Sequence, residues 1–242
     1  MTGIGNHVYI EKKTCKHCHS EDTVKSGVLR NKQRYKCKSC KRHFQKNTEK
    51  KKSNTQKQEQ IIKLYLEGTP IRGIARLLEI SHTWVIKFIK KYSAQIKPHL
   101  PLFSSDIEID ELYLYIGSKK KKRWLWTALC RKTKRILAFH IGQRSRSAVT
   151  KLYENIKPIE CNHYYTDSYK GFLTVFPKEK HKRNYAGTNT IEGFHSSLRH
   201  YQSRFRRRSK CYSKSESMVK ASMVLMMDKY HRQYTEQQKQ AA

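Results

Sequence analysis

The chain has 242 residues, of which 52 are Lys or Arg and 19 are Asp or Glu, so its formal net charge is +33. Its hydrophobic content of 37% allows a modest core, and no run of about 18 apolar residues is present to cross a membrane. Charge on this scale predicts a polyanionic partner, usually nucleic acid, although a packaging protein of the ribosomal or chromatin type stays open. The start, MTGIGNHVYIEKK, lacks the apolar stretch of a secretory signal, and we expect a cytoplasmic, nucleoid-associated protein.

The first segment, residues 8–46, carries two Cys-x2-Cys knuckles. They are separated by 18 residues and consist of Cys15, Cys18, Cys37 and Cys40. Four thiolates at this spacing are typical of a zinc ribbon, where they close a tetrahedral structural site. Between the knuckles the sequence predicts two short strands around a turn at residues 30–32. So small a unit needs its metal to fold, and we therefore expect a structural zinc ion.

A polar linker over residues 47–57 leads into three predicted helices in the segment 55–97. Thr55 begins a possible capping box, Pro70 suits the first turn of the second helix, and Ser81 can cap the third. A short helix, a tight turn and a second helix form the pattern of a helix-turn-helix. The residues expected to meet DNA are His82, Thr83, Lys87 and Lys90. The alternative is a plain three-helix bundle without groove contacts.

The remainder, residues 104–242, is the only segment long enough for a catalytic core. A three-strand meander is predicted in SDIEIDELYLYIG, WLWTALC and ILAFHIG, with exposed turns at SKKKKR and RKTKR. There follow a helix in RSAVTKLYENI, a strand in HYYTD and helices in SYKGFLTVF and TNTIEGFHSSLRHYQSRF, the last of these capped by Asn189 or Thr190. A final helix is expected from Ser215 to about Tyr230. This order predicts an α/β domain with a mixed sheet, of the ribonuclease H-like fold.

Acidic residues are concentrated in the first strand of this segment. Four of the nineteen fall in the six positions from Asp106 to Glu111. Because side chains alternate along a strand, Glu108 and Asp110 should point to one face of the sheet and Glu111 to the other.

Two further acids stand where the predicted fold would gather them. Asp167 closes the strand HYYTD, and Glu192, near a helix start, is the only acid in the basic stretch 180–215. Convergent carboxylates among so many cations suit two divalent ions about 4 Å apart, which clamp a phosphate and activate water or a 3′-hydroxyl. Oxygen ligands favour Mg²⁺ or Mn²⁺ over Zn²⁺. On spacing alone, each acid could equally be a solvated cap or an ion-pair partner.

Over nearly its whole length, the chain resembles the transposases of the insertion-sequence-one family, a compact bacterial DDE type. The likeness comprises the ribbon with QRYKCKSC, IRGIARLLEISHTWVIKFIKKY, IEIDELYLYIG followed by RWLW, YTDSYKGF, IEGFHSSLR and RRRSKCYSKSESM. The 24 residues between Asp167 and Glu192 are similar to the short interval of this family, and Arg199 follows seven residues after Glu192. The stretch NTIEGF is also similar to a sister family with a similar ribbon.

The resemblance implies an activity and a role for each matching residue. Asp110, Asp167 and Glu192 would be the metal-binding triad, and Arg199 a phosphate or helix-face partner. The protein would bind the terminal inverted repeats of a transposon and hydrolyse a phosphodiester at each end in a Mg²⁺-dependent, two-metal reaction. The freed 3′-hydroxyl would then attack target DNA. The partners would be double-stranded DNA and, on DNA, at least one more copy of the chain, with no membrane involved.

Two basic stretches are expected to hold backbone phosphates, which predicts salt-sensitive binding. They are KKKKR and FRRRSK, represented by Lys120, Lys121, Arg206 and Arg207. A solvated loop is the alternative for the first.

Two other functions compete with the transposase. A non-catalytic repressor would occupy the repeats and keep the ribbon and the helices but would not need the three acids. A metal-dependent endonuclease without strand transfer would use the same metal site. A tyrosine recombinase is disfavoured because none of the 15 tyrosines has an Arg-His-Arg setting.

Overall fold

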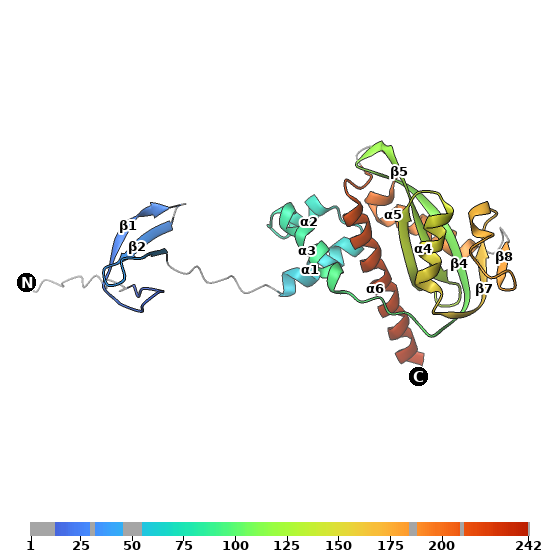
Figure 1. The fold of residues 1–242 in the computed structure, drawn as a ribbon, viewed down its shortest axis with the longest axis horizontal. Coiled ribbons are helices and arrows are strands. Elements are labelled where there is room, and N and C mark those ends of the chain that lie inside the picture. The colour runs from blue at the N-terminus through green and yellow to red at the C-terminus, as the bar shows by residue number, and fades with distance from the viewer. Residues whose placement is uncertain (1–12, 30–31, 46–54, 184–187, 209–210, 242) are drawn as a thin grey trace, which may run out of the picture. The chain divides into compact units, whose positions relative to one another are not determined.

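The computed structural model describes residues 13–29, 32–45, 55–183, 188–208 and 211–241 (Figure 1). The chain divides into two compact units, Met1–Asn54 and Thr55–Ala242. The three functional parts suggested by the sequence remain a prediction. Residues 8–12 and 46 of the expected ribbon, 30–31 of its turn and 209–210 of FRRRSK lie outside the described residues. Within the described part of the chain, no helix is long and apolar enough to cross a membrane.

The first unit contains one small antiparallel sheet. Its strands are β1 (Thr23–Leu29), β2 (Lys32–Cys37) and β3 (His43–Gln45), paired in that order. The two predicted strands are confirmed, and β3 is an addition. The buried residues of the unit are few, with Phe44 packed beside the cysteines. An apolar core this small is typical of units that a bound metal ion stabilises.

Three helices begin the second unit, and each starts within one residue of the position that the sequence predicts. They are α1 (Thr55–Leu66), α2 (Ile71–Leu77) and α3 (His82–Gln95). Ser81 caps α3, with its Oγ accepting a hydrogen bond from the backbone N–H of Trp84 at 3.1 Å. Gly68 separates α1 from α2 at φ +84°, a left-handed conformation that suits glycine. The helical prediction for this segment is therefore confirmed.

A mixed five-stranded sheet forms the rest of the second unit. Its strands are β4 (Phe103–Ile116), β5 (Ser118–Cys130), β6 (Ile136–Gly142), β7 (Glu160–Thr166) and β8 (His181–Arg183). They lie in the order β6-β5-β4-β7-β8, where β6, β5 and β4 are antiparallel and β4, β7 and β8 are parallel. An antiparallel meander extended by parallel strands is the predicted ribonuclease H-like arrangement, and the expected fold class is confirmed.

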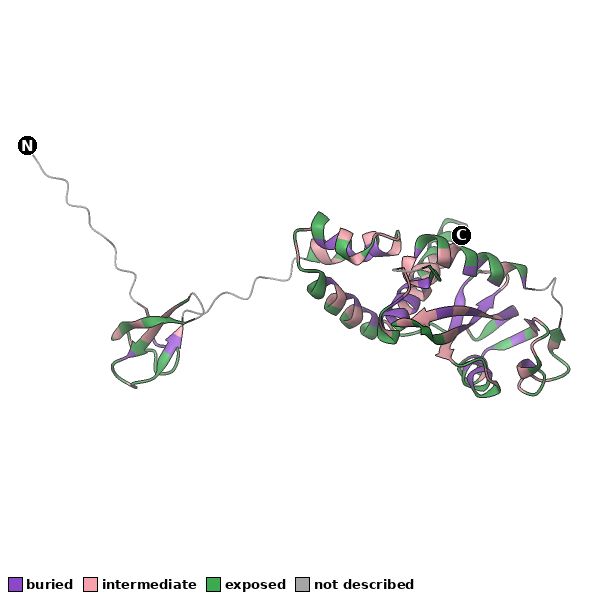
Figure 2. Cartoon of the chain, turned by 90° about the horizontal axis from the view of Figure 1, so that it is seen from above, coloured by how far each residue is buried: buried purple, intermediate pink, exposed green. Residues whose placement is uncertain are grey.

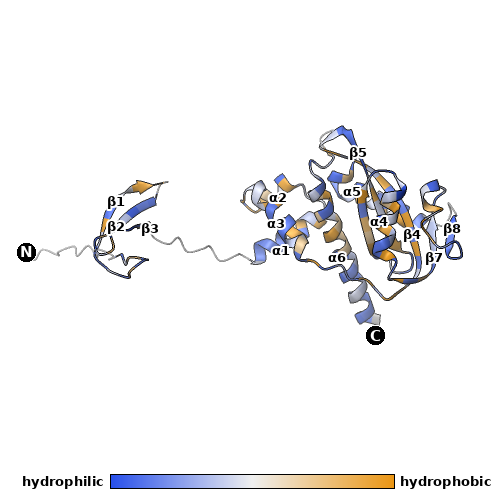
Figure 3. Cartoon of the chain, in the orientation of Figure 1, coloured by the Kyte–Doolittle hydropathy of each residue, from blue (hydrophilic) through white to orange (hydrophobic). Residues whose placement is uncertain are grey.

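Helices cover both faces of this sheet. On one face, α4 (Arg146–Ile156) packs over Ile107, Ile109 and Trp126, while α5 (Asn189–Tyr201) and α6 (Glu216–Ala241) cover the other face. Figure 2 shows the buried strands between these helices. The first half of α6 also packs against α1, α2 and α3, so this helix joins the core of the three helices to the core on its own face of the sheet. Its C-terminal end is hydrophilic (Figure 3).

Four local predictions are wrong. The stretch SKKKKR is not a turn but the start of β5, because β4 and β5 form one long hairpin that reverses at Gly117. The helix expected in SYKGFLTVF is reduced to a single 3-10 turn, η1 (Lys170–Phe172). The residue at the N-cap of α5 is Thr188, not Asn189 or Thr190. The last helix also extends beyond Tyr230, to Ala241.

Candidate functional site

The four knuckle cysteines converge in the first unit. Their sulfur atoms all lie within 4.8 Å of one another, with Cys15 Sγ 3.7 Å from Cys40 Sγ and Cys18 Sγ 3.6 Å from Cys37 Sγ. Zinc–sulfur bonds of about 2.3 Å in a tetrahedron place the sulfurs about 3.8 Å apart. The backbone N–H of Cys40 is the main cause that lowers the pKa of Cys37 to about 6. The backbone N–H of Ser20 lowers the pKa of Cys18, but burial and hydrogen bonds with the other cysteines outweigh it and raise this pKa to about 12. This cluster is compatible with a structural zinc ion.

In the second unit, the register of the sheet brings two of the predicted acids together. Ile109 on β4 pairs with Thr166, the last residue of the parallel strand β7, so the next residues, Asp110 and Asp167, are neighbours where β7 ends beside the middle of β4. One carboxylate oxygen from each, with one from Glu111, forms a group whose members all lie within 4.8 Å of one another. Among the described residues, these are the acids that the structure gathers. The group is compatible with a divalent metal ion.

The side chain of Asp110 is oriented by α5. Its Oδ2 lies 3.3 Å from Nδ1 of His195, a residue that is 5% exposed. The other ring nitrogen, Nε2, lies 3.4 Å from Oγ1 of Thr127 on the neighbouring strand β5. The imidazole therefore bridges two strands and fixes Asp110 on the α5 face. Asp167 is held separately, because its Oδ1 accepts a hydrogen bond from the backbone N–H of Tyr169 at 2.9 Å.

A buried acid fixes the start of α5. The side chain of Glu108 is 1% exposed, and it accepts hydrogen bonds from Nε of Arg131 at 2.7 Å and from the backbone N–H of Ile191 at 2.8 Å. Glu108 and Asp110 thus both meet α5, as strand alternation predicts. The backbone immediately before Glu192 is thereby tied to β4.

The structure does not include Glu192 in the group of close carboxylates. Its Oε1 accepts a hydrogen bond from Oγ1 of Thr188 at 3.0 Å, in the first turn of α5. Residues three and four apart on a helix share a face, so Glu192, His195 and Arg199 form one stripe. Since His195 contacts Asp110, Glu192 stands one helical turn from that contact. Its role as the third metal ligand remains a prediction.

Arg199 is a partly buried cation on the same helix face as His195. Its Nη2 donates to the carbonyl oxygen of Tyr113 at 3.5 Å, and its Nε is buried without a hydrogen-bond partner among the described residues. Burial, together with the charge of Arg207, lowers the pKa of Arg199, and Asp110 offsets part of this effect. A cation with an unused donor is suited to an anionic ligand such as a phosphate.

Glu111 is the acid that sequence reasoning did not select for the site. It points to the α4 face, as alternation predicts, and its Oε1 accepts a hydrogen bond from Nε of Arg144 at 2.7 Å. Burial is the largest cause that raises the pKa of Glu111 to about 7. Arg144 opposes this shift, while Asp110 and Asp167 add to it. The signal for this residue was present in the sequence, since Glu111 directly follows Asp110.

The predicted DNA-contact residues of α3 are mostly accessible. His82, Thr83 and Lys87 are exposed, and Lys90 is half-buried. Trp84 is 42% exposed and stacks on Phe88 with the ring centroids 5.4 Å apart.

The remaining predicted phosphate contacts differ from one another. Lys120 and Lys121 are exposed on the strand β5. Arg206 is exposed but donates to the carbonyl oxygens of Arg199 and His200, so it caps the end of α5. Arg207 lies over the ring of Tyr113, with its Cζ 5.9 Å from the ring centroid.

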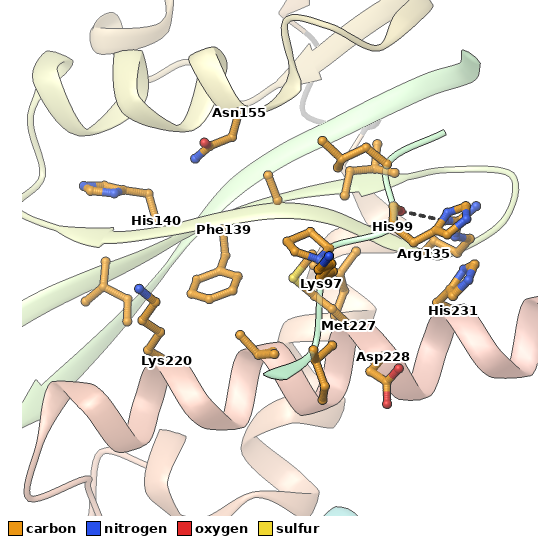
Figure 4. Close-up of a pocket in the computed structure, with 18 of the residues that line it drawn as sticks. Lys97, His99, Arg135, Phe139, His140, Asn155, Lys220, Met227, Asp228 and His231 are labelled. Carbon is orange, nitrogen blue, oxygen red and sulfur yellow. Dashed lines mark hydrogen bonds between the residues drawn. The ribbon is translucent and has the colours of Figure 1, made fainter. Parts of the chain in front are cut away.

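A cavity of about 740 Å³ lies elsewhere in the second unit, between β6 and α6 (Figure 4). Phe139 and Met227 contribute to its apolar wall. At one end, Nη2 of Arg135 donates to the carbonyl oxygen of His99 at 2.9 Å. None of the acids of the β4–β7 edge lines this cavity, as far as the described residues show. The candidate reaction centre is therefore the edge where β4 meets β7, not this cavity.

Comparison with known proteins agrees with this architecture. The family model described as IS1 transposase matches residues 105–233, which is more than half of the chain. Insertion element iso-IS1n protein InsB of Shigella dysenteriae is 28% identical over 123 residues, covering 51% of this chain and 94% of that protein. Insertion element IS1 4 protein InsB of Escherichia coli (strain K12) is 29% identical over 108 residues, covering 45% of this chain and 65% of that protein.

Among solved structures, a chain in the simian T-cell lymphotropic virus intasome with PP2A regulatory subunit B56 gamma matches with a TM-score of 0.33 and 12% identity. The match covers 58% of this chain and 59% of that one. This distant likeness adds nothing to the assignment, which rests on the family model and on the relatives. The chain belongs to the IS1 transposase family.

Proposed function

We propose that the chain is a DDE transposase that hydrolyses a phosphodiester at each end of a transposon and joins the freed 3′-hydroxyl to target DNA. The observation that carries this proposal is the adjacency of Asp110 and Asp167 on parallel strands. Glu192, on the helix whose His195 contacts Asp110, would be the third ligand. The three acids would bind Mg²⁺ or Mn²⁺, which oxygen ligands favour.

The residues present fit a divalent ion. The donors are all carboxylate oxygens, and Oε2 of Glu111 beside them is buried without a partner within the described residues. Bound cations would activate water or the 3′-hydroxyl and offset the charge of the phosphate.

The protein itself would supply orientation. His195 holds Asp110, the backbone N–H of Tyr169 holds Asp167, and Thr188 holds Glu192. Carboxylates held in this way need little rearrangement before reaction, which is the main protein contribution in phosphoryl transfer. Arg199 would donate its unused N–H to a phosphate oxygen.

DNA binding would use three parts of the chain. In this proposal, residues 8–46 form a zinc ribbon, residues 55–97 a helix-turn-helix with α3 in the major groove, and residues 104–242 the catalytic domain. Lys120, Lys121 and Arg207 would contact backbone phosphates. The net charge of +33 supports strong, salt-sensitive binding to double-stranded DNA. Because transposition joins two ends, we expect at least a dimer on DNA.

The test is cleavage of a labelled transposon end by the full-length protein in Mg²⁺, with wild type beside Glu192→Gln. Glu179→Gln is a matched control, because Glu179 is an exposed residue outside the site. We expect cleavage by the wild type and by the control, no cleavage by Glu192→Gln, and equal DNA binding by all three.

The competing functions give different results in the same assay. Binding without cleavage by the wild type would favour a repressor. Cleavage without joining of the labelled 3′ end to a target plasmid would favour an endonuclease. Cleavage by Glu192→Gln at the wild-type rate would remove Glu192 from the proposed triad.

A further inference from the structure

Glu111 is buried beside the proposed metal ligands, but it belongs to neither the predicted triad nor the stripe on α5. Its side chain is 8% exposed. Its Oε1 accepts the hydrogen bond from Arg144, and its Oε2 is buried with no hydrogen-bond partner among the described residues. A buried carboxylate oxygen without a donor is costly, and one explanation for such an atom is a water molecule or ion that binds it.

Glu108, three positions earlier on the same strand, is a structural glutamate whose hydrogen bonds can be compared with those of Glu111. Its side chain is 1% exposed, and both of its oxygens are bonded, Oε1 to Arg131 and Oε2 to the backbone N–H of Ile191. Among the described residues, only one of the two oxygens of Glu111 has a hydrogen-bond partner. A purely structural role, as the ion-pair partner of Arg144, therefore leaves its second oxygen unexplained.

The surroundings of Glu111 connect it to the acids of the sheet edge. One of its oxygens lies within 4.8 Å of an oxygen of Asp110 and of an oxygen of Asp167. Arg144, its partner, lies over the ring of Tyr169, with its Cζ 4.4 Å from the ring centroid. The backbone N–H of Tyr169 in turn donates to Asp167 Oδ1. This series of contacts links Glu111 to Asp167, while Asp110 is held separately by His195.

We propose that Glu111 is a fourth carboxylate of the metal centre, positioned by Arg144 so that Oε2 can bind a divalent cation. This inference rests on the proposed function, because it assumes that Asp110 and Asp167 bind the same ion. It extends the centre to both faces of β4, with Asp110 supplied from the α5 face and Glu111 from the α4 face.

The experiment is a Mn²⁺ titration of the full-length protein, bound to a DNA end, with free Mn²⁺ measured by electron paramagnetic resonance. The variants are Glu111→Gln, Asp110→Asn as the reference and Glu154→Gln as a matched control on the exposed face of α4. We expect Glu111→Gln to weaken Mn²⁺ binding by about tenfold or more. Glu154→Gln should bind as the wild type does.

The outcomes separate this inference from the proposed function. Unchanged Mn²⁺ affinity in Glu111→Gln, with lost affinity in Asp110→Asn, would overturn the role of Glu111 and leave the proposed function standing. No Mn²⁺ binding by the wild type would overturn both. Near-ultraviolet circular dichroism of the three tryptophans, one of which is Trp126 opposite Glu111, reports whether the variant is folded. If Glu111→Gln does not fold, Glu111→Asp serves for the same comparison. The shorter side chain keeps its charge but places its oxygens farther from the proposed cation.

Discussion

Replacing Glu108 tests whether this buried acid holds β4 and α5 together. Glu108→Ala removes the partner of Arg131 and also leaves the backbone N–H of Ile191 buried without an acceptor. Glu108→Gln removes the charge but retains an oxygen for Ile191. We therefore expect the alanine variant to be the less stable of the two.

The structure sets the expected size of these effects. Breaking a buried ion pair costs about 3–5 kcal/mol, and an unsatisfied buried N–H costs about 1–3 kcal/mol. The side chain of Arg131 is 32% exposed and lies 3.8 Å from Asp106, so solvent and Asp106 reduce the first cost. We expect about 3–4 kcal/mol for Glu108→Ala and about 1–2 kcal/mol for Glu108→Gln.

Urea unfolding followed by tryptophan fluorescence measures this difference. All three tryptophans, Trp84, Trp124 and Trp126, lie in the second unit, so the signal excludes the ribbon. Glu154→Ala, at an exposed position of α4, should change stability by no more than about 0.5 kcal/mol. Equal losses in Glu108→Ala and Glu108→Gln would refute the role of the Ile191 hydrogen bond, and no loss in either would refute the anchor.

Three further predictions concern other parts of the chain. The pKa of Glu111 is raised to about 7, so the contribution of this residue to stability is lost as pH rises from about 4.5 to 7. The free energy of unfolding of Glu111→Gln should therefore rise, relative to that of the wild type, by on the order of 2–3 kcal/mol between pH 4 and pH 8. Urea unfolding without divalent cations checks this, and a pH-independent difference would contradict it. Zinc chelation should unfold the first unit, which amide hydrogen exchange would detect as lost protection of β1 and β2. The tryptophan fluorescence of the second unit should not change, and a change in both signals would show that the units are coupled. Leu198→Ala, at a fully buried position of α5, should cost about 2–5 kcal/mol in urea unfolding, and a cost below about 1 kcal/mol would contradict the packing of α5 on the sheet.

Local signals in the sequence predicted the start of α3 and the position of α4, although the Ser145 cap of α4 was not predicted. Ser81 begins α3, and Ser145 begins α4 by accepting a hydrogen bond from the backbone N–H of Ala148, so both helices start where a capping residue stands. Strand alternation also assigned Glu108, Asp110 and Glu111 to the correct faces. These features depend on neighbouring residues, which is why a single sequence can reveal them.

The errors occur where pairing across strands decides the structure. A run of four lysines favours a solvated turn, but the pairing of Tyr115 with Lys122 continues the hairpin through it. The turn itself is placed by Gly117 at φ +79°. The same limit applies to SYKGFLTVF, where Phe172 and Phe176 are buried against the sheet rather than along a helix.

The sequence predicted which acids belong to the site, but it did not predict the contacts that hold their side chains. The adjacency of Asp110 and Asp167 follows from strand order, because β4 and β7 are parallel neighbours and their pairing ends at Ile109 and Thr166. His195 as a partner of Asp110, and the unbonded oxygen of Glu111, depend on how α5 and α4 pack on the sheet. No spacing in the sequence specifies either one.

The most direct test of the account is anomalous scattering from crystals of the DNA-bound protein grown in Mn²⁺. The account predicts manganese peaks at the β4–β7 edge, within bonding distance of Asp110, Asp167 and Glu192. Manganese bound only elsewhere, or Asp110 and Asp167 without a peak between them, would contradict a metal-dependent transposase centre at this edge.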